Sequence, residues 1–265
     1  MHRSVYALIA SALLWSCGGP SNSLGLIYVR GRAVEPVGDS LLAMTAEGID
    51  GLVIYDIRSG AIDTIGSDAL DSPLQVQQVE RRWYVSNIRD GRPEIAVLSW
   101  DGALERRIDL RDISAHAHQF AVLPRGRIVV ESTNSELLQI DGDSITSFAL
   151  IETGPRPSLI AGAAGGVLHA VPGKHMTLFN EFGNIRWRVE WAWAVTAFFT
   201  DISVDRQGRI HMMAGVPGDS LFRVYTVARD DGDVISWSPA GRYATFIVEK
   251  RGRFRPDSAS NWLGN

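Results

Sequence analysis

Short apolar segments recur along this chain at nearly equal intervals. Five of them are LLAMT, WYVSN, IVVES, VLHAV and IHMMA, which lie around residues 43, 85, 129, 169 and 212. These positions are 42, 44, 40 and 43 residues apart. Short runs rich in aliphatic, aromatic and β-branched residues are typical of buried strands. The pattern therefore predicts a chain built from one β unit that repeats about every 42 residues.

A second pattern, in which a glycine turn joins two strands of alternating apolar residues, has the same period. The turn glycines are Gly60, Gly102, Gly142 and Gly183, which are 42, 40 and 41 residues apart. Glycine adopts the positive φ angles of tight hairpin turns without strain. Together, the two patterns predict about four strands in each unit.

The fifth unit can be aligned in two ways. The segment FRVYTVARDDGDVISWS places the hairpin turn at Gly232. The segment VISWSPAGRYATFIV, which is similar to AVLSWDGALERRIDL in the second unit, places the turn at Gly241 instead. The sequence leaves both alignments open.

Four-stranded units of this length predict an all-β fold, the β-propeller, because solenoid repeats of similar length show helical periodicity. The stretch DRQGRIHMMAG at residues 205–215 is then interpreted as a turn between the first two strands of a blade. The segments FTDISVDRQGRIHMM and AHQFAVLPRGRIVV resemble the NHL and TolB-like six-bladed propellers, and the resemblance extends from Ala33 to about Val248. It implies a fold, and propellers serve many functions.

The number of blades depends on how the ring closes. The tail after Val248 is too short for a complete sixth blade, so closure needs a strand from the other end of the chain. The segment LGLIYVRG at residues 24–31 fits that role, and pairing the two ends would remove an exposed strand edge. We expect six blades with a composite closing blade; the alternative is five blades.

The N-terminus has the three-part pattern of a secretory signal: a basic start, an apolar run from Val5 to Trp15 and a small polar stretch. The segment LLWSC resembles the lipobox of bacterial lipoproteins, in which Cys17 would be acylated. The alternative is an ordinary signal with an incidental cysteine. We expect a signal peptide at 1–16, a tether at 17–23 and a single propeller domain at 24–265. The protein would be lipid-anchored at the bacterial cell envelope, facing the periplasm or the cell surface.

Charge and motifs exclude several classes of function. The net charge is −4, and the 26 basic residues are scattered among 30 acidic ones, so no basic stripe suggests a nucleic-acid partner. No GxSxG nucleophile motif occurs, and Cys17 is the single cysteine. No phosphate-binding loop precedes a helix. No cofactor is predicted, although a divalent metal is possible.

The blade-to-blade connections and the loops joining second to third strands should share one face of the propeller. Binding residues usually lie on such loops because the rigid strands position them. We therefore expect this face to recognise a ligand. Its candidate residues are His116, His118, Arg156, His175, Trp193 and Asp201.

Two pairs of histidines are possible metal ligands. His116 and His118 form HAH, and alternate residues of an extended strand point the same way, so both rings could reach one ion. Asp201 or His175 could supply a third ligand. Ordinary loop histidines without a metal are the alternative. His169 and His211 occupy equivalent second-strand positions in successive units. The resemblance to zinc-dependent NHL-like lyases implies that these two histidines face the channel as metal ligands. The neighbouring strand residues instead favour packing of both histidines between blades.

These patterns predict a lipid-anchored propeller that acts as a non-catalytic binding scaffold. Its partner beyond the membrane would be a protein, a peptide or a glycan. The alternative is a metal-dependent lyase or hydrolase at the channel mouth, with His116 and His118 as ligands and Asp201 as a ligand or general base.

Overall fold

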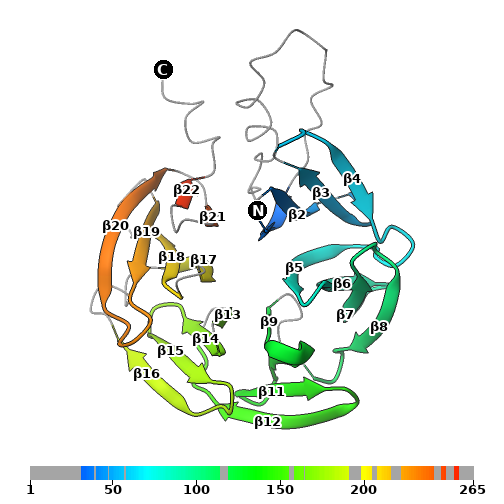
Figure 1. Ribbon diagram of the computed structural model, residues 1–265. Helices are drawn as coiled ribbons and strands as arrows, with labels where there is room; N and C mark the ends of the chain where they lie inside the picture. The colour runs from blue at the N-terminus through cyan, green and yellow to red at the C-terminus, as the bar shows by residue number, and fades with distance from the viewer. Residues whose placement is uncertain are drawn as a thin grey trace, which may run out of the picture.

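A computed structural model describes residues 31–38, 40–46, 48–56, 58–113, 119–154, 158–163, 165–190, 198–204, 208–215, 222–241, 246–248 and 254–256. These residues form a β-propeller, as the repeat predicts. Figure 1 shows five four-stranded sheets arranged round a central axis, from the blue first blade to the orange fifth. Within each blade, consecutive strands are antiparallel neighbours. The described part of the chain contains no helix long and apolar enough to cross a membrane.

The first two blades follow each other directly in the sequence. Blade 1 consists of β1 (Gly31–Val37), β2 (Leu41–Ala46), β3 (Leu52–Asp56) and β4 (Ile62–Ile65). Blade 2 consists of β5 (Pro73–Val79), β6 (Arg82–Arg89), β7 (Arg92–Ser99) and β8 (Leu104–Asp109).

The next three blades complete the repeat. Blade 3 contains β9 (Phe120–Val122), a short 3-10 turn at Pro124–Gly126, β10 (Ile128–Glu131), β11 (Glu136–Asp141) and β12 (Ser144–Leu150). Blade 4 contains β13 (Leu159–Ala163), β14 (Gly166–Val171), β15 (His175–Asn180) and β16 (Ile185–Val189). Blade 5 contains β17 (Phe198–Val204), β18 (Ile210–Gly215), β19 (Phe222–Val227) and β20 (Val234–Gly241).

Strand pairing decides which glycine forms the hairpin turn of the fifth unit. Gly232 has a φ of 79° and lies between β19 and β20, whereas Gly241 is the last residue of β20. The alignment with the turn at Gly241 is therefore wrong. Gly208, with a φ of 80°, lies between β17 and β18, so the glycine of DRQGR belongs to a turn between the first two strands of a blade.

A small sheet lies where the ring closes. It pairs β21 (Phe246–Val248) with β22 (Phe254–Pro256), and β21 contacts both β1 and β17. In Figure 1 the two short strands lie beside blade 5, at the gap before blade 1. The strand expected at residues 24–31 lies outside the described residues, except for Gly31, which begins β1.

The core is divided into layers between neighbouring blades. One apolar cluster joins blades 3 and 4 and includes Val129, Phe148, Val167 and Phe179. Comparable clusters join blades 1 and 2, 2 and 3, and 4 and 5. The second strands are almost fully buried, while the fourth strands are largely exposed at the rim. Side chains on the two faces of a second strand therefore contact different neighbouring blades.

Amide side chains connect the innermost strands. Gln77 of β5 donates to the carbonyl oxygen of Phe120 at 2.7 Å and accepts from the amide of Val122 at 2.9 Å. Gln119 accepts in the same way from the amide of Ile160 at 3.2 Å. These bonds satisfy backbone groups on strand edges that would otherwise remain unpaired. Glu35 of β1 takes the corresponding role in blade 1 and accepts a hydrogen bond from the backbone of Gln78.

Candidate functional site

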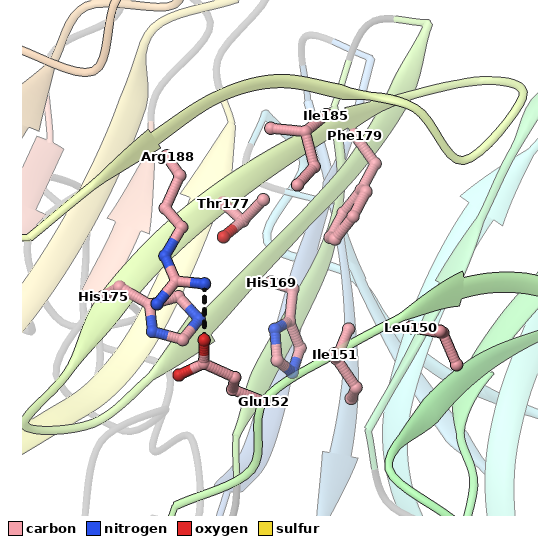
Figure 2. A pocket seen from close by; sticks show the side chains of 9 residues that line it. All are labelled: Leu150, Ile151, Glu152, His169, His175, Thr177, Phe179, Ile185 and Arg188. Carbon is pink, nitrogen blue, oxygen red and sulfur yellow. Dashed lines mark hydrogen bonds and ion pairs between the residues drawn. The ribbon is translucent and has the colours of Figure 1, made fainter.

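A pocket of about 210 Å³ lies between blades 3 and 4, and we call it the His169 pocket. Figure 2 shows its side chains, which come from β14, β15 and β16 of blade 4 and from the end of β12 with the connection that follows it. The lining residues are Leu150, Ile151, Glu152, His169, His175, Thr177, Phe179, Ile185 and Arg188.

Strand register brings the polar lining residues onto one face of blade 4. His169 of β14 is paired with Thr177 of β15, and Val171 is paired with His175. Thr177 is paired in turn with Arg188 of β16. Directly paired residues of antiparallel strands point to the same side, and so do alternate residues of one strand. The two histidines, Thr177 and Arg188 therefore all face blade 3.

His169 is a buried polar side chain whose ring has no hydrogen-bond partner among the described residues. It is 0% exposed, and no described group forms a hydrogen bond with Nδ1 or Nε2. The closest described charge is the Oε2 atom of Glu131, which is 3.9 Å from Nε2 and thus too far for a hydrogen bond. That carboxylate, itself buried, accepts a hydrogen bond from the hydroxyl of Ser158. Each unpaired buried ring nitrogen lowers the free energy of unfolding by about 1–3 kcal/mol. A ligand that forms hydrogen bonds with these nitrogens would recover part of that loss.

His175 is the second buried histidine of the pocket. It is 2% exposed, and its Nδ1 has no hydrogen-bond partner in the part of the chain that the structure describes. Burial lowers the pKa of His175, and the positive charge of Arg188 lowers it further. The ring is therefore neutral at pH 7, with one nitrogen that can donate and one that can accept.

Charged and apolar groups surround the mouth of the pocket. Nη1 of Arg188 is 2.9 Å from Oε1 of Glu152, the ion pair drawn in Figure 2, and Nη2 is 3.0 Å from Oε1 of Glu190. The hydrogen bond from Arg188 holds the pKa of Glu152 below its usual value. Leu150 and Ile185 are exposed at the same mouth. A ligand would thus pass a mixed rim before reaching the histidines.

Two of the six residues predicted for the recognition face, His175 and Asp201, lie among the described residues. His175 lines the His169 pocket, and Asp201 lies in β17, where it pairs with Met213. The other four, His116, His118, Arg156 and Trp193, lie outside the described residues, as does Cys17. Their roles stay predictions. No group of three or more His, Cys, Asp or Glu side chains among the described residues is placed to hold a metal ion.

Sequence reasoning missed His169 as a pocket residue because it paired His169 with His211. Leu168 packs in the same apolar cluster as Ile210 and Met212, so those residues face each other between blades 4 and 5. His169 therefore faces blade 3, while His211 points away from blade 4. The two histidines are on opposite faces of their blades and are not equivalent.

No protein-family model and no curated protein sequence matches this chain. Solved structures do match it. One is virginiamycin B lyase from Staphylococcus aureus, a catalytically inactive histidine-to-alanine variant solved with quinupristin. Its sequence is 10% identical to this chain, and its TM-score is 0.58 over 79% of this chain and 70% of the lyase. A chain of a nidogen–laminin complex is 14% identical, with a TM-score of 0.58 over 88% of this chain and 85% of that chain.

A putative 6-phosphogluconolactonase from Bacteroides uniformis is 14% identical, with a TM-score of 0.59 over 84% of this chain and 76% of the lactonase. At these identities the similarity establishes the fold alone, and the same fold occurs in enzymes and in proteins of binding complexes. The chain is a β-propeller, and its function has to be argued from its own site.

Proposed function

We propose that this protein is a non-catalytic binding propeller of the NHL or TolB-like type, and that its ligand enters the His169 pocket. The observation that carries the proposal is the burial of His169 and His175 with ring nitrogens that no described group pairs. Folding a chain around unpaired polar atoms costs stability, and a bound ligand recovers part of that cost. Small-molecule sites combine apolar side chains with a few placed polar groups, and the lining of the His169 pocket contains both.

The lining residues support binding more than chemistry. The described pocket lining contains no serine, cysteine or lysine; its possible nucleophiles are Thr177 and Glu152, and Glu152 is already paired with Arg188. Ser158 is close by, but its hydroxyl donates to Glu131 rather than to either histidine. The hydrogen bond from serine to histidine that is typical of an activated serine nucleophile is therefore not formed by Ser158 with His169 or His175.

We also propose that the protein works at the bacterial cell envelope, attached to the membrane through acylated Cys17. The support is the lipobox-like sequence LLWSC at the end of an apolar run. Loss of labelled fatty acid from the Cys17→Ser variant would support this anchor, and continued labelling would contradict it. A protein, peptide or glycan of the envelope would then be the source of the ligand.

A second candidate is a metal-dependent lyase or hydrolase with His116 and His118 at the channel mouth. The observation in its favour is the structural similarity to virginiamycin B lyase, in which a histidine-to-alanine variant is catalytically inactive. Elemental mass spectrometry separates the two functions, because the enzyme needs a stoichiometric ion that a His116→Ala/His118→Ala variant loses.

Closing the mouth of the pocket should abolish ligand retention. Ile185 is 58% exposed at the rim, so Ile185→Trp can place a large ring there without disturbing the core. We expect wild-type protein, incubated with a small-molecule extract of bacterial envelopes and desalted, to release a compound of unchanged mass on denaturation. The Ile185→Trp variant should release at least tenfold less.

Ile235 is also 58% exposed, on the outer strand of blade 5, and Ile235→Trp is the matched control that should retain the compound. Equal retention by both variants would place the binding site elsewhere. Conversion of the compound during incubation would support the enzyme instead.

A further inference from the structure

We infer that the His169 pocket binds a neutral, hydroxyl-bearing small molecule of about the size of one monosaccharide ring. The inference rests on the proposed function and adds the chemical class of the ligand. Charge, hydrogen-bonding capacity and volume each contribute to it.

The charges round the pocket disfavour ions of either sign. An anion at the histidines would lie close to the buried Glu131, whose Oε2 is 3.9 Å from Nε2 of His169, and would pass Glu152 at the mouth. A cation would have to pass the positive charge of Arg188 at the mouth, and the carboxylate of Glu131 near His169 already accepts a hydrogen bond from Ser158. An ion that leaves water needs a compensating charge, and the lining offers none that is not already paired. A neutral ligand avoids this cost.

The unpaired ring nitrogens favour hydroxyl groups. No described group pairs with Nδ1 and Nε2 of His169 or with Nδ1 of His175, and Thr177 lines the same space. A neutral imidazole has one donor and one acceptor nitrogen. A hydroxyl can donate to one nitrogen and accept from another, so it can pair with either tautomer of each ring. A ligand with several adjacent hydroxyls could therefore satisfy both histidines together.

Volume and apolar lining limit the size of the ligand. The pocket holds about 210 Å³, which is below the range of about 300–1,000 Å³ typical of drug-sized ligands. At ~30 Å³ per water molecule it equals about seven waters, which is room for one substituted six-membered ring. Phe179 and Ile151 supply apolar surface in the lining, which suits the C–H face of such a ring.

Histidine ring signals in NMR spectra of the full-length protein provide the test. The neutral probes are glucose, N-acetylglucosamine and myo-inositol; the ionic probes are acetate, inorganic phosphate and tetramethylammonium. We expect at least one neutral probe to shift the signals of both His169 and His175 saturably, and the ionic probes to leave them unchanged. His169→Phe keeps a planar ring of similar size and should weaken binding of that probe about tenfold, the loss of roughly one buried hydrogen bond.

Two further variants complete the test. His211→Phe is the matched control, because His211 is equally buried but lies on the other face of another blade; it should leave affinity unchanged. Glu131→Gln should allow acetate to shift the His169 signal, because it removes the charge that opposes an anion. This variant remains informative if His169→Phe fails to fold.

Each outcome decides the inference. A shift by acetate or phosphate alone in the wild type would overturn the neutral class, yet leave the pocket as a binding site. No shift by any neutral probe would overturn the inference, while ligand retention that Ile185→Trp abolishes would still support the proposed function. Shifts by neutral probes without retention of any extract compound would support the ligand class.

Discussion

Replacing Gly183 with alanine is expected to lower the free energy of unfolding by about 3 kcal/mol. Gly183 lies in the turn between β15 and β16 with a φ of 81°, and a Cβ atom there would be 1.8 Å from the carbonyl oxygen of Phe148 in β12. The positive φ costs about 1–2 kcal/mol for a residue with a side chain, and the clash adds about 1–3 kcal/mol. Because Phe148 belongs to blade 3, the substitution separates the two blades that form the His169 pocket.

Gly60 is the matched control for this prediction. It occupies the corresponding turn of blade 1 with a φ of 72°, and a Cβ atom there would have nothing within 4 Å. Gly60→Ala should therefore lower the free energy of unfolding only by the cost of the positive φ angle, about 1–2 kcal/mol. Urea unfolding of the two variants measures the difference. Equal losses would show that contact between Gly183 and Phe148 does not matter for stability.

Glu35→Gln is expected to stabilise the protein above neutral pH by up to about 3 kcal/mol. Burial raises the pKa of Glu35 from 4.5 to about 7, although the hydrogen bond from the backbone of Gln78 lowers it. Between these two pKa values the folded protein binds a proton that the unfolded chain has lost. Stability therefore falls as pH rises from about 4.5 to about 7, by about 1.4 kcal/mol for each unit of the pKa difference.

Glutamine keeps the acceptor for the Gln78 amide and carries no charge, so the variant should show none of this pH dependence. Thermal unfolding between pH 4 and pH 8 measures both proteins. The control is Glu105→Gln, which removes a carboxylate from an exposed ion pair with Arg82 and should change stability by less than about 1 kcal/mol. A wild-type stability that stays constant from pH 5 to pH 8 would contradict the assignment of Glu35.

The repeat could be predicted from sequence because it depends on short-range patterns. Strand composition recurs at a fixed interval, and the turn glycines Gly60, Gly102, Gly142 and Gly183 all have positive φ angles in the structure. The fifth unit was ambiguous because both Gly232 and Gly241 follow apolar segments, and only strand pairing distinguishes them. Local residues therefore predict the blades, while register within a blade needs the folded sheet.

The His169 pocket could be predicted only in part, because it depends on which face of a strand each residue occupies. The sequence offers His175 as a candidate because it follows a loop, and in the structure it is the first residue of β15, whereas His169 lies within β14. β13 ends at Ala163 and β14 begins at Gly166, whereas β17 ends at Val204 and β18 begins at Ile210, so the two connections differ in length. A shift of one residue moves a side chain to the opposite face, so the alignment of His169 with His211 failed.

The central claim is that the ligand of this propeller binds between blades 3 and 4, at His169 and His175. Crystals soaked in glucose, N-acetylglucosamine or myo-inositol test it most directly. Our account predicts electron density for one ring in the His169 pocket, with hydroxyls within about 3.2 Å of the imidazole nitrogens. A pocket that holds only solvent, together with a bound ring at the loops that carry His116 and His118, would contradict it.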